Sequence, residues 1–97
     1  MESGAVSITI KLFASLREAL GEAEFSLALE TLPAADIVDG AVSVAAIKSA
    51  LCTRGTQWQE ALNQPNLVHA LNHKVVYVDA MVADGDELAL SPPMTGG

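Results

Sequence analysis

The chain has 97 residues, the length of one small domain; 51% of them are hydrophobic and 18% are charged, a composition that argues against intrinsic disorder. Twelve acidic residues against five scattered basic ones give a net charge of −7. We therefore expect neither nucleic acid nor a membrane surface as a direct partner. A basic surface on another protein fits this charge better.

Cysteine usage and the start of the chain suggest a compartment. A single cysteine, Cys52, excludes an intrachain disulfide, although small secreted domains usually need several. Residues 1–4 are acidic and lack the order of a signal peptide, in which basic residues precede apolar ones. No apolar run approaches the roughly 20 residues of a transmembrane helix. The sequence thus predicts a soluble, cytoplasmic protein.

The first third of the chain predicts a strand, a short helix and a second strand. Residues 6–12 alternate apolar and polar side chains, which predicts a half-buried β-strand. A short helix should follow, because Ser15 and Glu18 have the spacing of a capping box and Gly21 suits the position just past a helix end. Alternation resumes over residues 25–29 and predicts a second strand.

The middle of the chain predicts a loop followed by helices. Turn formers are frequent over residues 31–42, so we expect a loop there. Ser43 is the expected N-cap of a helix over residues 44–54, whose apolar residues have helical spacing. A short second helical stretch should bury Trp58.

The last third predicts strands separated by turns. Strands are expected over residues 67–71, 75–78 and 87–90, with turns at residues 72–73 and 84–85. The order is strand, helix, strand, helix and then strands. This order predicts an α+β roll in which a sheet packs on the longer helix.

The end of the chain is its most informative stretch. It reads Ser91-Pro92-Pro93-Met94-Thr95-Gly96-Gly97. The prolines favour a stiff, extended exit, and the glycines could enter a channel too narrow for side chains. The terminal carboxylate is ionised at neutral pH. Such a tail suits delivery of an acyl group into another protein's active site, whereas an inert terminus of chance composition is the alternative.

Several short stretches together carry a resemblance to a known family. They are residues 10–14 with Arg17, Glu18 and Gly21, then residues 70–72, 84–87 and 92–97. On these stretches the chain resembles the small, sulfur-carrying subunits of molybdopterin synthase, the ubiquitin-like MoaD family. The resemblance covers most of the chain except residues 31–42. It implies an α+β, β-grasp fold with a mixed sheet packed on one main helix, a domain over residues 1–91 and an extended tail over residues 92–97.

The resemblance also implies a chemistry for the terminal glycine. In this family an ATP-dependent, E1-like activating enzyme adenylylates that residue, here Gly97, and a sulfur donor protein converts it into a thiocarboxylate. The sulfur then passes to cyclic pyranopterin monophosphate in the pocket of a large subunit, within a heterotetramer, and forms the dithiolene of molybdopterin. ATP belongs to the activating enzyme, so this chain itself should bind no cofactor. No metal is expected either, because no ligand set has a recognisable spacing.

The site residues follow from the same resemblance. Gly97 would be the catalytic position. The partner-binding positions would be Pro92, Pro93, Met94, Thr95 and Gly96. Phe13 lies by alternation opposite the apolar face of the first strand, where it would either belong to a partner-facing patch or cover the entry of the first helix.

Three other side chains, Cys52, His69 and His73, could be interpreted as a sulfur carrier or as metal ligands, but their positions in the sequence do not favour either role. Cys52 could carry a persulfide, but a single thiol near a helix end is more often a small packed side chain. His69 and His73 are four apart, yet on a strand and its turn this spacing does not align them as metal ligands.

Two further functions stay open at this point. The thiocarboxylate could serve tRNA thiolation or thiamine synthesis, or the tail could be conjugated to lysines. Alternatively, the chain could be a non-catalytic β-grasp interaction module whose tail is chemically inert.

Overall fold

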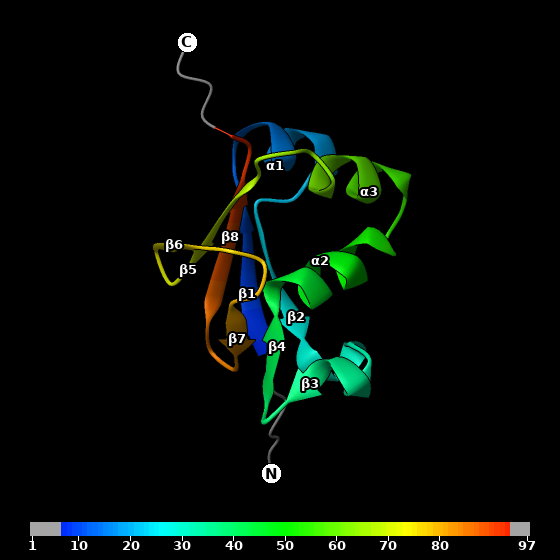
Figure 1. Ribbon diagram of the computed structural model, residues 1–97. Coiled ribbons are helices and arrows are strands. Elements are labelled where there is room, and N and C mark those ends of the chain that lie inside the picture. The colour runs from blue at the N-terminus through cyan, green and yellow to red at the C-terminus, as the bar shows by residue number, and fades with distance from the viewer. Residues whose placement is uncertain (1–6, 94–97) are drawn as a thin grey trace.

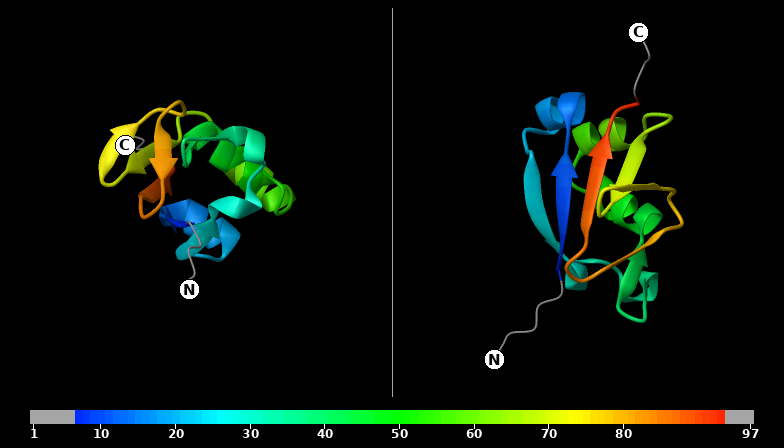
Figure 2. Two further views of the ribbon diagram at one scale, coloured as in Figure 1. Left: turned by 90° about the horizontal axis from the view of Figure 1, so that it is seen from below. Right: turned by 90° about the vertical axis from the view of Figure 1, so that its left-hand side faces the viewer.

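The computed structural model describes residues 7–93 and shows a mixed five-stranded sheet with helices on one side (Figures 1 and 2). The strands lie in the order β2-β1-β8-β5-β6. Their bounds are Ser7–Leu12 for β1, Glu24–Ala28 for β2, Val68–Leu71 for β5, Lys74–Val76 for β6 and Glu87–Ser91 for β8. The two central strands, β1 and β8, are parallel, and all other neighbours are antiparallel.

Three α-helices accompany the sheet. They are α1 at Ala14–Leu20, α2 at Val44–Cys52 and α3 at Thr56–Leu62, with single 3-10 turns at Leu29–Thr31 and Ala34–Asp36. The longest helix, α2, begins where expected, because the hydroxyl of Ser43 accepts a hydrogen bond of 3.1 Å from the Ala46 N–H. The end of α1 is also confirmed, since Gly21 is left-handed and its N–H donates to the Arg17 carbonyl at 2.9 Å.

The core is aliphatic and lies between the sheet and the helices. Its most completely buried side chains are Ile8, Ile10, Leu12, Leu16, Val42, Val44, Ile47, Leu51, Leu62, Val82, Leu88 and Leu90. Burial of one such side chain contributes about 1.5–3 kcal/mol relative to leaving it exposed. The alternation of β1 and β8 therefore fixes which face of each strand packs on the helices.

A second, three-stranded sheet corrects the loop predicted for residues 31–42. Strands β3 (Ile37–Val38), β4 (Ala41–Ser43) and β7 (Met81–Ala83) pair in the order β3-β4-β7. Asp39 and Gly40 both have positive φ angles, 53° and 78°, as in the two-residue turn of a β-hairpin. Strands of two or three residues are too short to show alternation, which is why β3, β4 and β7 escaped prediction.

Two helix boundaries differ from the predictions. Helix α1 begins at Ala14 and its N-cap is Phe13, so the predicted capping box at Ser15 is wrong. The Phe13 N–H still donates to the Leu90 carbonyl at 3.1 Å, and the chain turns into the helix directly from the sheet. Helix α2 ends at Cys52, short of residue 54, because Gly55 already begins the turn into α3.

Strand β6 is also shorter than predicted. It ends at Val76, whereas the sequence predicted a strand to residue 78. The carbonyl of Val78 accepts a hydrogen bond of 2.9 Å from the Ala45 N–H, so the chain has crossed from the sheet edge to α2 at that point. Within residues 7–93, no helix is long and apolar enough to cross a membrane.

Candidate functional site

The base of the C-terminal tail lies at the end of a central strand. β8 is paired on both sides, with β1 as far as Leu90 and with β5 as far as its last residue, Ser91. Pro92 and Pro93 follow directly and are half-buried. Proline cannot donate to a sheet ladder, so the strand ends here and the chain is free to leave the sheet. The predicted residues Met94, Thr95, Gly96 and Gly97 lie outside the described residues.

An apolar surface lies beside this tail base, on the face of the sheet that points away from the helices. Leu88 and Leu90 are fully buried against the helices, so the alternation of β8 points Ala89 to the opposite face. The antiparallel register then places Ala70 of β5 beside Ala89, and Val75 of β6 beside Ala70. Val75 is 73% exposed.

Phe13 and Val68 extend this surface to the tail base. Val68 pairs with Ser91, the last residue of β8. Phe13 directly follows β1, its N–H continues the pairing with β8 at Leu90, and its side chain is 45% exposed. We call Phe13, Val68, Ala70, Val75 and Ala89 the outer-face patch. The exposure of Phe13 leaves it accessible to a partner, and its role as a contact residue stays a prediction.

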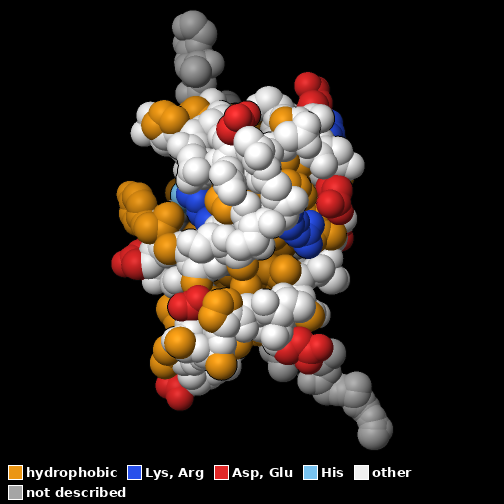
Figure 3. Space-filling model, turned by 90° about the vertical axis from the view of Figure 1, so that its right-hand side faces the viewer, with side chains coloured by type: hydrophobic (Ala, Val, Ile, Leu, Met, Phe, Trp, Pro, Cys, Tyr) orange, Lys and Arg blue, Asp and Glu red, His pale blue; other side chains and the backbone are white. Residues whose placement is uncertain are grey.

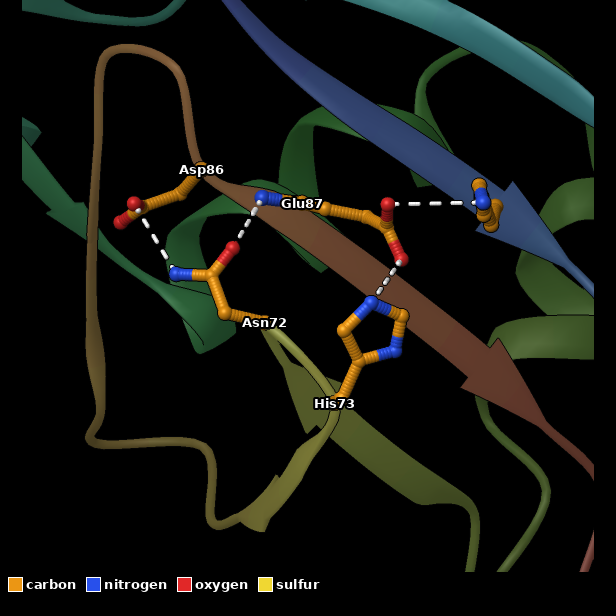
Figure 4. Close-up of polar contacts among 5 residues, drawn as sticks. Asn72, His73, Asp86 and Glu87 are labelled. Atoms are coloured by element: carbon orange, nitrogen blue, oxygen red, sulfur yellow. Dashed lines mark hydrogen bonds and ion pairs between the residues drawn. The ribbon is translucent and has the colours of Figure 1, made fainter.

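Asn72 joins the β5–β6 turn to the start of β8 (Figure 4). Its amide Nδ2 donates to Oδ1 of Asp86 at 3.1 Å, and its Oδ1 accepts from the Glu87 N–H at 3.0 Å. Its backbone N–H also donates to the Glu87 carbonyl at 2.9 Å. Asn72 has a φ of 49°, a left-handed conformation that asparagine tolerates better than most residues. We call Asn72 with Asp86 and Glu87 the β8 clasp.

The two acidic side chains of the β8 clasp, Asp86 and Glu87, also form hydrogen bonds or ion pairs with other neighbouring residues. Oδ2 of Asp86 accepts from the Ala83 N–H at 2.9 Å across the turn before β8. Glu87 lies 3.4 Å from Nζ of Lys11 on β1 and 3.9 Å from Nε2 of His73 (Figure 4). Residues 70–72 and 84–87, which carried much of the resemblance, therefore fix the position of β8 in the sheet.

A groove of about 710 Å³ lies elsewhere, between β2 and α2, where Figure 3 shows hydrophobic side chains along a hollow in the surface. Asp36 and Arg54 are the charged residues of its lining, which includes no residue of β8. Arg54 pairs with Glu22 at 3.5 Å and stacks on the rings of Phe25 and Trp58, at 4.4 and 4.9 Å from their centroids. The groove is thus separate from the tail base.

The two histidines and the cysteine are not brought together as ligands. His69 is buried under the helices, and its Nε2 lies 3.1 Å from Nζ of Lys48. His73 is exposed in the turn, and Cys52 is a half-buried residue at the end of α2 that packs on the core. In residues 7–93 no three His, Cys, Asp or Glu side chains are placed to hold a metal ion.

Sequence reasoning named Phe13, Pro92 and Pro93 as partner-binding positions. The structure places Phe13 at the end of β1 and the prolines at the end of the neighbouring strand β8, and the Phe13 N–H donates to the Leu90 carbonyl. Sequence reasoning missed the other members of the outer-face patch, namely Val68, Ala70, Val75 and Ala89. Strand alternation could have assigned each to a face, but their adjacency depends on the register between strands that are distant in sequence.

Comparisons with known proteins identify relatives over nearly the whole chain. The model of the ThiS family matches residues 10–97. The chain is 29% identical over 90 residues to the molybdopterin synthase sulfur carrier subunit of Haemophilus influenzae, and 30% identical over 90 residues to that of Escherichia coli. Each alignment covers 93% of this chain and 99% of the relative.

Solved structures agree with this assignment. SAMP1 from Haloferax volcanii superposes with a TM-score of 0.65 at 28% identity, over 94% of this chain and 99% of the other. A complex of subunits 1 and 2 of the molybdopterin-converting factor from Helicobacter pylori contains a chain that superposes with a TM-score of 0.58 at 17% identity, over 94% of this chain and 99% of the other, which shows a shared fold. The expected β-grasp fold is confirmed, and the chain belongs to the ThiS family of ubiquitin-like proteins.

Proposed function

We propose that the chain is the sulfur carrier subunit of a molybdopterin synthase. The observation that supports this most strongly is the agreement of sequence along almost the full length of two relatives that carry this name. The Gly-Gly stretch at residues 96–97 fits the same role, because it stands two residues after the proline pair at which a central strand ends. The catalytic pocket would lie on a large subunit, as the Helicobacter pylori complex of two subunits suggests.

The proposed chemistry begins at the carboxylate of Gly97. A carboxylate is a poor electrophile because its negative charge repels nucleophiles. Attack of this carboxylate on ATP in an E1-like enzyme would release pyrophosphate and form an acyl-adenylate, which has AMP as a good leaving group. The terminal sulfur of a persulfide on a donor protein would then displace AMP. Cleavage of the remaining S–S bond by a thiol would leave the sulfur on Gly97 as a thiocarboxylate.

In the proposed complex this chain supplies position and sulfur, and the large subunit supplies the pocket for cyclic pyranopterin monophosphate. The outer-face patch would contact the partner, because exposed apolar side chains beside the tail would be covered as the tail enters. The β8 clasp would hold the strand from which the tail leaves. Pro92, Pro93, Met94, Thr95 and Gly96 would line the path of the tail into the partner, without acting as acids or bases.

Reconstitution tests this proposal. The chain is combined with a molybdopterin synthase large subunit, an E1-like enzyme, ATP, a sulfur donor and cyclic pyranopterin monophosphate, and molybdopterin formation is measured. The variant lacking Gly97 should fold normally and form no molybdopterin, because its terminal carboxyl lies one residue short of the reaction centre. Molybdopterin formation by this variant would contradict the proposal.

Conjugation to protein lysines is the second candidate. It is favoured by the likeness at 25% identity to the H. volcanii small archaeal modifier protein 1. The two functions differ in the final acceptor of the acyl group. Peptide mass spectrometry of cell extracts would find lysines linked through an isopeptide bond to Gly97 if the chain is a modifier, whereas a carrier would leave Gly97 free or thiocarboxylated.

A further inference from the structure

Lys48 of α2 and His69 of β5 form a polar pair that the proposed function does not use. Nζ of Lys48 lies 3.1 Å from Nε2 of His69. His69 pairs across the sheet with Leu90, a fully buried residue, so its ring points to the helix-covered face, and it is only 8% exposed. The pair thus lies on the face opposite the outer-face patch, and Lys48 is half-buried over it.

This pair places two basic groups in contact without a compensating acid. Among residues 7–93, no carboxylate lies within ion-pair distance of Lys48. The other titratable group beside it is the thiol of Cys52, one turn later on α2. On the neighbouring strand β6, the residue paired with His69 is Val76, which is not titratable.

Burial makes the neutral forms of both groups more abundant. Desolvation lowers the pKa of Lys48, and the nearby Cys52 thiol offsets this in part. Desolvation also lowers the pKa of His69, and the positive charge of Lys48 lowers it further. A neutral amine beside a neutral imidazole is a nucleophile next to a proton acceptor.

We propose that Lys48 is a site for reversible addition of carbon dioxide, with His69 accepting the proton that is released. The lone pair of the neutral amine forms a C–N bond to the carbon of CO₂, and one C=O electron pair moves onto oxygen. The nitrogen then gives a proton to Nε2 of His69. The products are a carbamate and an imidazolium, with no leaving group and no redox change.

Two features of the site select this ligand. CO₂ is small and uncharged, so a half-buried amine is accessible to it. The product is an anion and a cation in contact, and their attraction offsets the desolvation that each charge costs in a partly buried site. This inference is independent of the tail, because neither Lys48 nor His69 takes part in the proposed sulfur chemistry.

The first test is carbon NMR of the full chain in ¹³C-labelled bicarbonate at neutral pH. The α-amino group of a chain also forms a carbamate near neutral pH, so the lysine carbamate is identified by its correlation to the lysine side-chain protons. This signal is expected for the wild type and for Lys74→Arg, in which an exposed lysine of β6 is replaced, and it should be lost in Lys48→Arg. Absence of the signal from the wild type, or its persistence in Lys48→Arg, would overturn the proposal.

The second test follows the imidazole. The carbamate replaces a positive neighbour of His69 by a negative one, so the pKa of His69 in the wild type, followed by proton NMR, should rise when CO₂ is added. Lys48→Arg should show no such rise. His69→Gln should reduce the carbamate signal and His73→Gln should not. An unchanged His69 pKa would contradict the assigned proton acceptor even if His69→Gln failed to fold.

Discussion

Single side chains decide how firmly β8 is held, and Asn72 is the clearest example. It contacts β8 through its side-chain oxygen, its side-chain nitrogen and its backbone N–H. Its amide is suited to this place because it both donates to Asp86 and accepts from the Glu87 N–H. An aspartate would retain the acceptor but would face the Asp86 carboxylate.

Asn72→Asp should therefore lower the free energy of unfolding by about 1 kcal/mol or more at neutral pH, from one lost hydrogen bond and the new repulsion. Part of the loss should be regained as the pH falls through about 4, the reference pKa of the introduced aspartate, because its protonated form no longer repels. Urea unfolding measures the effect. The matched control is Asn66→Asp, which adds the same charge at another exposed asparagine with positive φ, 63°. Equal losses in both variants would contradict the role of the clasp.

His69 gives the molecule a pH dependence of its own. Burial and the charge of Lys48 lower the pKa of His69 in the folded state. When the pH is lowered, the imidazole is therefore protonated first in the unfolded chain, where its pKa is about 6.5. The stability that His69 contributes is present above this pH and is lost as the pH falls through the lower folded-state pKa. His69→Gln should flatten the decline of stability below about pH 6.5, whereas His73→Gln, at an exposed turn, should not. Identical pH profiles for wild type and His69→Gln would refute this.

At the scale of elements, the outer-face patch is formed by three strands and the residue that follows β1. Its most exposed member is Val75, at 73%, so a charge there should leave folding intact. When a carboxylate replaces an apolar side chain that an interface buries, the apolar contact is lost and the charge must be desolvated. The patch therefore offers a sharp test of which face meets the large subunit.

Val75→Glu should weaken binding to the large subunit by about tenfold or more, as measured by isothermal titration calorimetry. Val38→Glu is the control, because Val38 is 58% exposed on β3 in the other sheet and the charge change is the same. Unchanged affinity in Val75→Glu would place the interface on another face.

The elements that sequence predicted well are those with local signals. Residues 6–12 alternate over a full strand, and Ser43 caps its own helix, so both were identified correctly. The three-stranded sheet was missed because its strands are two or three residues long. The outer-face patch was missed for another reason, since Val68, Ala70, Val75 and Ala89 meet only through a register that no local pattern encodes.

At the scale of the whole molecule, the charge of −7 should matter for association more than for folding. A basic surface on the large subunit would accelerate encounter through long-range attraction, which salt screens over about 10 Å at 0.1 M. The association rate measured by stopped flow should fall as salt is raised, while the dissociation rate changes little. An association rate independent of salt would argue against a basic partner surface.

The overall fold was foreseen from the resemblance, but the strand pairing that holds the base of the tail was not. A central strand that is paired on both sides ends at the proline pair, so the folded domain serves as a fixed base for the tail. The outer-face patch and the tail base then lie together at one end of β8. On this account the chain contributes a single reactive atom, the sulfur on Gly97.

Mass spectrometry of Gly97 tests that claim most directly. The chain is incubated with an E1-like enzyme, ATP and a sulfur donor, and its C-terminal peptide is fragmented, because oxidation of Met94 adds nearly the same mass as replacement of oxygen by sulfur. We predict sulfur on Gly97 that depends on ATP. A terminal carboxylate that stays unmodified, with an activating enzyme that is active on another carrier, would contradict the account.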